Sequence, residues 1–149
     1  MKINNLNNNF SLNAIVILMI LKKKRRLKIT EAILVLPFIS KSNVINYISK
    51  PNVSIKSLEQ LIAYNPDFIS NFNNLFYNCI SESLNTIMFL EDIGLIKLER
   101  NKIILKKEQL DLGKNPGKRL FKINKSLDNL INIISGDKYE TYLNLRVQL

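Results

Sequence analysis

The sequence predicts a mainly α-helical protein with one short β-hairpin in its second half. Apolar residues recur at three- and four-residue steps along most of the 149 residues, as on the buried faces of helices. Nearly half of the residues are hydrophobic and only four are Pro and four are Gly, which argues against a disordered chain. The length fits one domain, residues 1–149, with a single core.

The first helix is expected to begin after Asn9 or Ser11, where a side-chain oxygen can cap it, and to end near Lys24. Its apolar stretch, residues 10–21, is shorter than the roughly 20 residues that span a membrane. The positive charges follow this stretch, whereas a secretion signal carries them before it. We therefore expect a buried core helix in a cytoplasmic protein with no membrane partner.

Short helices are expected next. Thr30 is a candidate cap for a helix over residues 31–36, which Pro37 should end or kink because proline lacks an amide donor. Residues 40–48 form another expected helix, and Ser54 is a candidate cap for a third.

The middle of the chain predicts two helices joined by a turn. Pro66 suits the first helical position, and apolar residues then recur at helical spacing up to Cys79. Ser81 and Ser83 are cap-type residues, so we expect a turn there. A second helix follows, and Gly94 should stop it.

Two β-rich runs, residues 95–99 and 103–105, flank the polar residues 100–102 and predict a hairpin. Helix, turn, helix and hairpin in this order are typical of a winged helix-turn-helix with the hairpin as its wing. The periodic segment 120–134 predicts a closing helix after a loop, and residues 139–145 predict a docking helix. The predicted fold is thus mainly α and winged helix-turn-helix-like, with additional N- and C-terminal helices.

The sequence offers no recognisable catalytic, metal or cofactor site. It contains no His, which removes the commonest general base and zinc ligand, and Cys79 is its single cysteine, best explained as a small buried hydrophobe. The loop from Gly113 to Arg119 lacks the spacing and the Ser or Thr of a phosphate-binding loop. Asp67 is not followed by the Glu-x-Lys of a nuclease, and the adjacent Glu91 and Asp92 point about 100° apart on a helix. We expect no enzyme activity, no cofactor and no small-molecule substrate.

The net charge of +10 favours nucleic acid or an acidic protein surface as partner. One basic group lies at the end of the first helix and a second on and after the wing, and both either contact DNA phosphates or form solvated surface. The candidate phosphate contacts are Lys22, Lys23, Lys24, Arg25, Arg26, Lys28, Arg100, Lys102, Lys106 and Lys107. The helix before the wing is poor in Arg and Lys, which argues against base-specific reading by it.

The order of these segments resembles the middle component of three-component ABC systems, including the small subunit of Lamassu-type antiphage defence. The resemblance covers nearly the whole chain. It rests on Asn13 and Ala14 in the first apolar helix, the stretch from Ala32 to Pro37, residues 58–62, the helix from Pro66 to Phe76, Gly94-Leu95-Ile96, and the closing tyrosine and leucine tail. Where the family often carries a basic or aromatic residue near the start of the helix before the wing, this chain has Ser81-Glu82-Ser83.

The resemblance implies a non-enzymatic linker between an SMC-like or Rad50-like ABC ATPase, which senses foreign DNA, and an effector, often a nuclease. Double-stranded DNA would be reached through the complex. The apolar residues at two chain bends are the expected partner contacts, with ordinary core packing as the alternative. These residues are Leu36, Pro37, Phe38, Tyr139, Tyr142 and Leu145.

A free-standing winged-helix transcription regulator is the alternative function. Such a regulator usually dimerises and presents a basic recognition helix to DNA. Neither feature is visible in the sequence, so the adaptor is the leading hypothesis.

Overall fold

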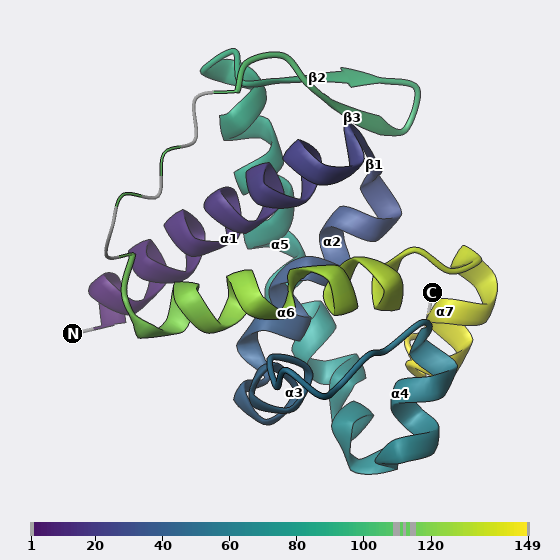
Figure 1. Ribbon diagram of the computed structural model, residues 1–149. Coiled ribbons are helices and arrows are strands. Elements are labelled where there is room, and N and C mark those ends of the chain that lie inside the picture. Colours follow the sequence, from purple (N-terminus) through teal and green to yellow (C-terminus); the bar gives the residue numbers. More distant parts are fainter. Residues whose placement is uncertain (1, 109–110, 112, 114–115, 149) are drawn as a thin grey trace.

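The computed structural model describes residues 2–108, 111, 113 and 116–148, with side chains from Phe10 onward. The described residues are mainly helical, with a small three-stranded antiparallel sheet at one end (Figure 1). The elements are α1 (Lys2–Lys24), β1 (Arg26–Lys28), α2 (Ile29–Ser40), α3 (Ser42–Ile48), α4 (Leu58–Tyr64), the 3-10 helix η1 (Pro66–Ile69), α5 (Phe72–Asp92), β2 (Ile96–Glu99), β3 (Lys102–Leu105), α6 (Lys118–Ile134) and α7 (Lys138–Asn144).

Helix α2 lies at the centre of the fold and contacts α1, α3, α5 and α6. Leu34, Val35 and Phe38 of α2 are fully or almost fully buried, because neighbours cover the helix on most of its sides. The ring of Phe38 packs on that of Phe72, with centroids 4.9 Å apart. This continuous core fixes the positions of the surface elements described below.

The expected end of this helix at Pro37 is wrong, because α2 continues through Pro37 to Ser40. The proline removes one backbone hydrogen bond. The Ser40 hydroxyl donates to the carbonyl of Leu36 at 2.7 Å, and the packing of α2 on four other helices outweighs the local loss. The helix also starts at Ile29, so Thr30 is not its cap. Instead the Glu31 carboxylate accepts from the amide of Lys28 at 2.9 Å.

Helix α1 ends at Lys24 as predicted but begins at Lys2, well before the expected start near Asn9. Its apolar centre, from Val16 to Leu21, is buried, which confirms a core helix. Among the described residues, no helix is long and apolar enough to cross a membrane.

The predicted turn at Ser81 and Ser83 is wrong, since α5 runs unbroken from Phe72 to Asp92. Ser83 and Thr86 face the core, and the Thr86 hydroxyl donates to the Glu82 carbonyl at 2.8 Å within the helix. The first of the two expected helices, from Pro66, is also divided. Pro66 opens the separate 3-10 helix η1, and Asn71, with a φ of 58°, turns the chain into α5. The helix-turn-helix is therefore absent from the predicted place.

The cap of α4 lies three residues later than expected. Ser57, rather than Ser54, caps the helix by accepting from the amide of Gln60. Asn129 of α6 holds this loop in place. Its side chain accepts from the amide of Ile55 at 2.8 Å and donates to the carbonyls of Ile48 and Val53. These bonds fasten α6, which the apolar spacing predicts, to the loop between α3 and α4.

The hairpin follows α5 as predicted. Gly94 has a φ of 75° and closes a Schellman motif, in which the amide of Leu95 donates to the carbonyl of Leu90. Strands β2 and β3 are joined by Arg100 and Asn101, both with positive φ, as a two-residue hairpin turn requires. Strand β1 was not expected. It pairs with the other edge of β3, which makes the order β1-β3-β2.

Candidate functional site

The outward face of the sheet carries a concentration of positive charge. In the register, Arg26, Ile104 and Lys97 form one row across the three strands, and Lys28, Lys102 and Glu99 form the next. Neighbours directly across a sheet point to the same side. The row between them, Leu27, Ile103 and Leu98, faces the core. We call Arg26, Lys28, Lys97 and Lys102 the basic sheet face.

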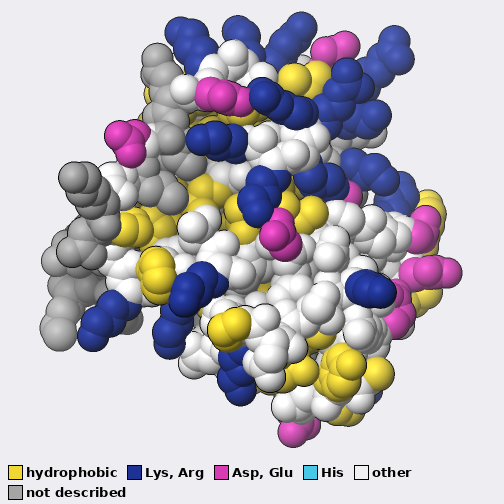
Figure 2. All heavy atoms as spheres, viewed as in Figure 1, with side chains coloured by type: hydrophobic (Ala, Val, Ile, Leu, Met, Phe, Trp, Pro, Cys, Tyr) yellow, Lys and Arg dark blue, Asp and Glu magenta, His cyan; other side chains and the backbone are white. Residues whose placement is uncertain are grey.

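Strand β1 brings together two basic groups that are far apart in the sequence. Residues 22–28 arrive from the end of α1 through Arg25, whose φ of 66° turns the chain into β1. Residues 97–107 arrive with the hairpin, and Arg100 sits at its turn. Figure 2 shows Lys and Arg side chains gathered over the end of the molecule where Figure 1 places the sheet. The two groups form one surface because β3 pairs with β1.

Three of the expected phosphate contacts are engaged within the chain. Lys23 pairs with Asp128 and Arg25 with Glu108, each at 2.6 Å. Lys24 lies 3.3 Å from Glu31 and donates to the Ser135 hydroxyl. Among the described residues, the other expected contacts form no ion pair and are exposed. They are Lys22, Arg26, Lys28, Arg100, Lys102, Lys106 and Lys107.

The expected partner contacts are mostly core residues. Leu36, Pro37 and Phe38 are buried within α2, so the alternative of core packing holds for them. Tyr142 and Leu145 are also buried, at 4% and 0% exposure. Buried side chains offer little surface to a docking protein, so their burial favours the alternative of core packing at these five positions. The exception is Tyr139, at 64% exposure.

Tyr142 fastens α7 to the rest of the fold. Its hydroxyl donates to the carbonyl of Thr30 at 2.9 Å, and its ring meets that of Phe76 edge-on. Burial raises the pKa of Tyr142 to about 12, because the phenolate would lose its hydration. The expected helix in the C-terminal tail is thus confirmed as α7, and its inner side packs on the rest of the chain.

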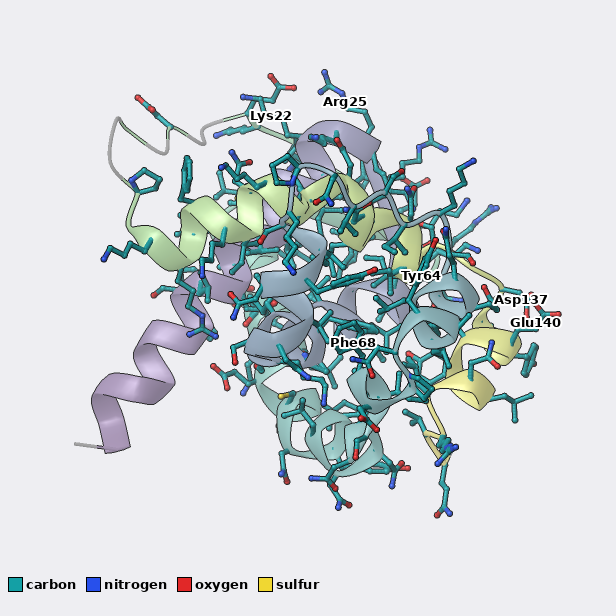
Figure 3. The ribbon with its side chains drawn as sticks, turned by 60° about the horizontal axis from the view of Figure 1, so that its bottom comes forward. Lys22, Arg25, Tyr64, Phe68, Asp137 and Glu140 are labelled. Atoms are coloured by element: carbon teal, nitrogen blue, oxygen red, sulfur yellow. The ribbon has the colours of Figure 1, made fainter. Side chains whose placement is uncertain are left out.

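The outer face of α7 combines exposed apolar side chains with charges of both signs, because the Lys138 ammonium lies 4.9 Å from the centroid of the Tyr139 ring and Asp137 and Glu140 are acidic. Leu143 is 75% exposed and lies one helical turn after Tyr139. Asp137 caps the helix and Glu140 lies beside these apolar residues. Figure 3 places Asp137 and Glu140 together at the α7 end, away from Lys22 and Arg25. We call Tyr139, Leu143, Asp137 and Glu140 the α7 surface.

The described residues contain no group of three or more His, Cys, Asp or Glu side chains placed to hold a metal. Burial raises the pKa of the Cys79 thiol, with a further contribution from Glu82 and an opposing one from a hydrogen bond to Ser40. In the Gly113-to-Arg119 loop, Lys114 and Asn115 lie outside the described residues, and Gly117 opens α6.

Comparison with known protein families assigns the chain. The model of the family ABC-three component (ABC-3C) system Middle Component 3 matches residues 6–149. The chain belongs to this family. Comparisons with curated proteins and with solved structures found no match.

As a Middle Component 3 protein, the chain is a component of a three-component ABC system. A subunit of this kind has to contact other components, so exposed surfaces of distinct chemistry are the features that matter. The residues that the family model matches include the sheet and α7, so both surfaces lie within the matched part of the chain.

Four residues of these surfaces are missing from the set that the sequence predicts: Lys97, Leu143, Asp137 and Glu140. Lys97 belongs to the basic sheet face, and the alternation Ile96-Lys97-Leu98-Glu99 places it outward, opposite to the buried Ile96. Leu143 is the second, because a tail of tyrosines and leucines does not by itself show which of them are buried. The helical spacing of Tyr139 and Leu143 separates them from the buried Tyr142.

Proposed function

We propose that this Middle Component 3 chain is a non-catalytic adaptor that joins an SMC-like or Rad50-like ABC ATPase to an effector, often a nuclease. Its setting is a bacterial antiphage or anti-plasmid defence complex of the Lamassu type. Family membership supports work within a three-component ABC system. The absence of His from the sequence supports a non-catalytic role.

The observation that carries the proposal is the presence of two exposed surfaces of different chemistry, one mainly basic and one largely apolar, on different parts of one small chain. The basic sheet face presents Arg26, Lys28, Lys97 and Lys102. The α7 surface presents Tyr139 and Leu143 beside two carboxylates. Figure 2 shows Lys and Arg side chains concentrated over the sheet end, with a few acidic side chains among them. Complementary charge selects partners, so these surfaces suit two different partners held at once.

The basic sheet face also supports contact with the backbone of double-stranded DNA in the assembled complex. Exposed Lys and Arg side chains on one face bind phosphates without reading bases. The chain contrasts here with a free-standing regulator, because α5, the helix before the hairpin, contains no Lys or Arg and has no turn within it. Backbone contact within a larger assembly therefore fits better than recognition of one operator sequence.

Co-expression with the ATPase and the effector encoded beside it tests the adaptor. We expect one complex containing all three chains on size-exclusion chromatography, and none between ATPase and effector when this chain is left out. Tyr139→Glu with Leu143→Glu should release one protein partner. Phe121→Glu, at an apolar residue of α6 that is 52% exposed, is the matched control. A homodimer that binds one palindromic DNA site and neither protein would overturn the proposal.

A further inference from the structure

Helix α5 carries a row of apolar side chains that the rest of the described chain leaves exposed. Tyr77, Leu84 and Met88 are 47%, 42% and 58% exposed, and Ile80 is half-buried. The spacings of three, four and four residues place these four side chains along one side of the helix. We call them the α5 row. The neighbouring side of α5, with Phe72, Phe76 and Leu90, is buried and supplies most of the contacts of this helix with the core.

Both ends of the α5 row are defined by other parts of the chain. At the first end, the Tyr77 hydroxyl donates to the carbonyl of Gln148, and the amide of Gln148 donates to the Asn73 side chain at 3.1 Å. At the other end, Glu91 accepts from the amide of Leu98 at 3.3 Å. The row thus extends from the C-terminal segment to strand β2, over about three helical turns.

The charge that α5 contributes beside the row is negative, in contrast to the net charge of +10 of the whole chain. Helix α5 contains no Lys or Arg, and its acidic residues Glu91 and Asp92 lie at the end of the row, whereas Glu82 is half-buried on another side of the helix. Glu91 and Asp92 follow Met88 by three and four residues, so they flank the end of the row. The C-terminal end of a helix adds further negative potential.

These features identify one kind of occupant. We propose that the α5 row is the docking site for an amphipathic helix of a partner protein, with apolar residues along one side and Lys or Arg beside Glu91 and Asp92. An amphipathic helix places residues at three- and four-residue steps and matches a row of this length. This inference rests on the proposed adaptor function, and it assigns a surface separate from the basic sheet face and from α7.

A second copy of the chain fits the row less well. A symmetric pairing would place α5 against α5, and neither helix supplies a cation for the other's Glu91 and Asp92. Two chains of charge +10 would also repel each other. The charge around the row therefore favours a different, basic helix.

Methionine methyl signals provide a direct test. The sequence has three methionines, and Met88 is exposed whereas Met19 is buried. The probe is a synthetic helical peptide of about three heptads with Leu at the core positions and Lys at the others. We expect it to shift the methyl signal of Met88 and to leave that of Met19 unchanged. A peptide with Glu in place of every Lys should bind at least about tenfold more weakly.

Variants of the α5 row then test whether the peptide binds at these side chains. Leu84→Glu should weaken peptide binding at least about tenfold, and Met88→Gln should weaken it with less risk to folding. Phe121→Glu, on the exposed side of α6, should leave binding unchanged. Equal binding of the two peptides, or a Met88 signal that does not respond, would overturn the inference. So would a homodimer in sedimentation that Leu84→Glu converts to monomer.

The complex with the ATPase and effector distinguishes this inference from the proposed function. If the unaltered chain assembles with neither protein, the adaptor proposal fails. If the unaltered chain assembles and Leu84→Glu and Met88→Gln assemble equally well, only the docking site on α5 fails. Loss of one partner from both variants, with Phe121→Glu still complete, would support the site.

Discussion

Lys28 and Lys102 lie directly opposite each other on the neighbouring antiparallel strands β1 and β3. Both are exposed, and neither forms an ion pair with another described residue. Like charges at opposite positions of a sheet are destabilising. Glu99 lies across from Lys102 on its other side and offsets part of this repulsion. The two lysines therefore lower the stability of the folded chain.

Replacing Lys28 with Glu should therefore stabilise the protein. The new carboxylate would face Lys102, and we expect the free energy of unfolding to rise by about 0.5 kcal/mol. Urea denaturation at low salt measures this change. Lys56→Glu, at an exposed loop position with no ion pair among the described residues, is the control. A destabilised Lys28→Glu protein would contradict the interpretation of the pair.

The salt dependence of DNA binding should depend on the unpaired cations of the sheet. Changing Arg26 and Lys28 to Ala should reduce the slope of log K against log salt by about 2, because each phosphate contact contributes roughly 0.9. Titrations of duplex DNA at several salt concentrations measure the slope. Lys23→Ala is the matched control, since Lys23 already pairs with Asp128. Equal slopes in all three proteins would leave the sheet as solvated surface.

Alkaline pH should loosen α7 through Tyr142. Burial raises the pKa of Tyr142 to about 12, whereas the unfolded chain titrates near 10. Between these values the unfolded state loses its proton and the folded state keeps it, so stability is complete below about pH 10 and falls as pH rises toward 12.

The variant Tyr142→Phe isolates this effect. Its free energy of unfolding at pH 7 should be about 1 kcal/mol lower, because the hydrogen bond to Thr30 is lost. Its deficit relative to the unaltered protein should shrink above pH 10, because phenylalanine does not ionise. Thermal melts between pH 7 and pH 11.5 measure both effects. A constant deficit across this range would show that Tyr142 titrates normally.

Replacing Asn13 of α1 with Ala should stabilise the folded protein. The Asn13 side chain is fully buried, and neither its amide nitrogen nor its oxygen has a partner among the described residues. Such unpaired polar atoms cost about 1–3 kcal/mol, and Ala is the better helix former. We expect Asn13→Ala to raise the free energy of unfolding by a net value of about 1 kcal/mol, because some packing is lost with the side chain. Asn124→Ala, exposed on α6, should change it much less. A destabilised Asn13→Ala would indicate that Asn13 has a partner in the folded protein.

Local signals in the sequence determined several elements. The apolar periodicity of α1 and α6 predicted helices, and Gly94 with the two β-rich runs predicted the hairpin. These features depend on steric preferences and spacing within a few residues, which the sequence shows directly. The basic residues of the sheet were also named from the sequence, except Lys97.

Only the tertiary structure decided how these elements join. Pro37 and the serines at 81 and 83 are local signals for a break, yet α2 and α5 run through them because packing on both helices outweighs those preferences. Residues 26–28 show no strand pattern of their own. They become β1 because the free edge of β3 supplies the partner, and that non-local pairing merges two distant basic segments into one face. The docking of α7 likewise decided that Tyr142 is buried and Tyr139 faces solvent. The residue spacing in this short helix does not show which of its sides meets the core.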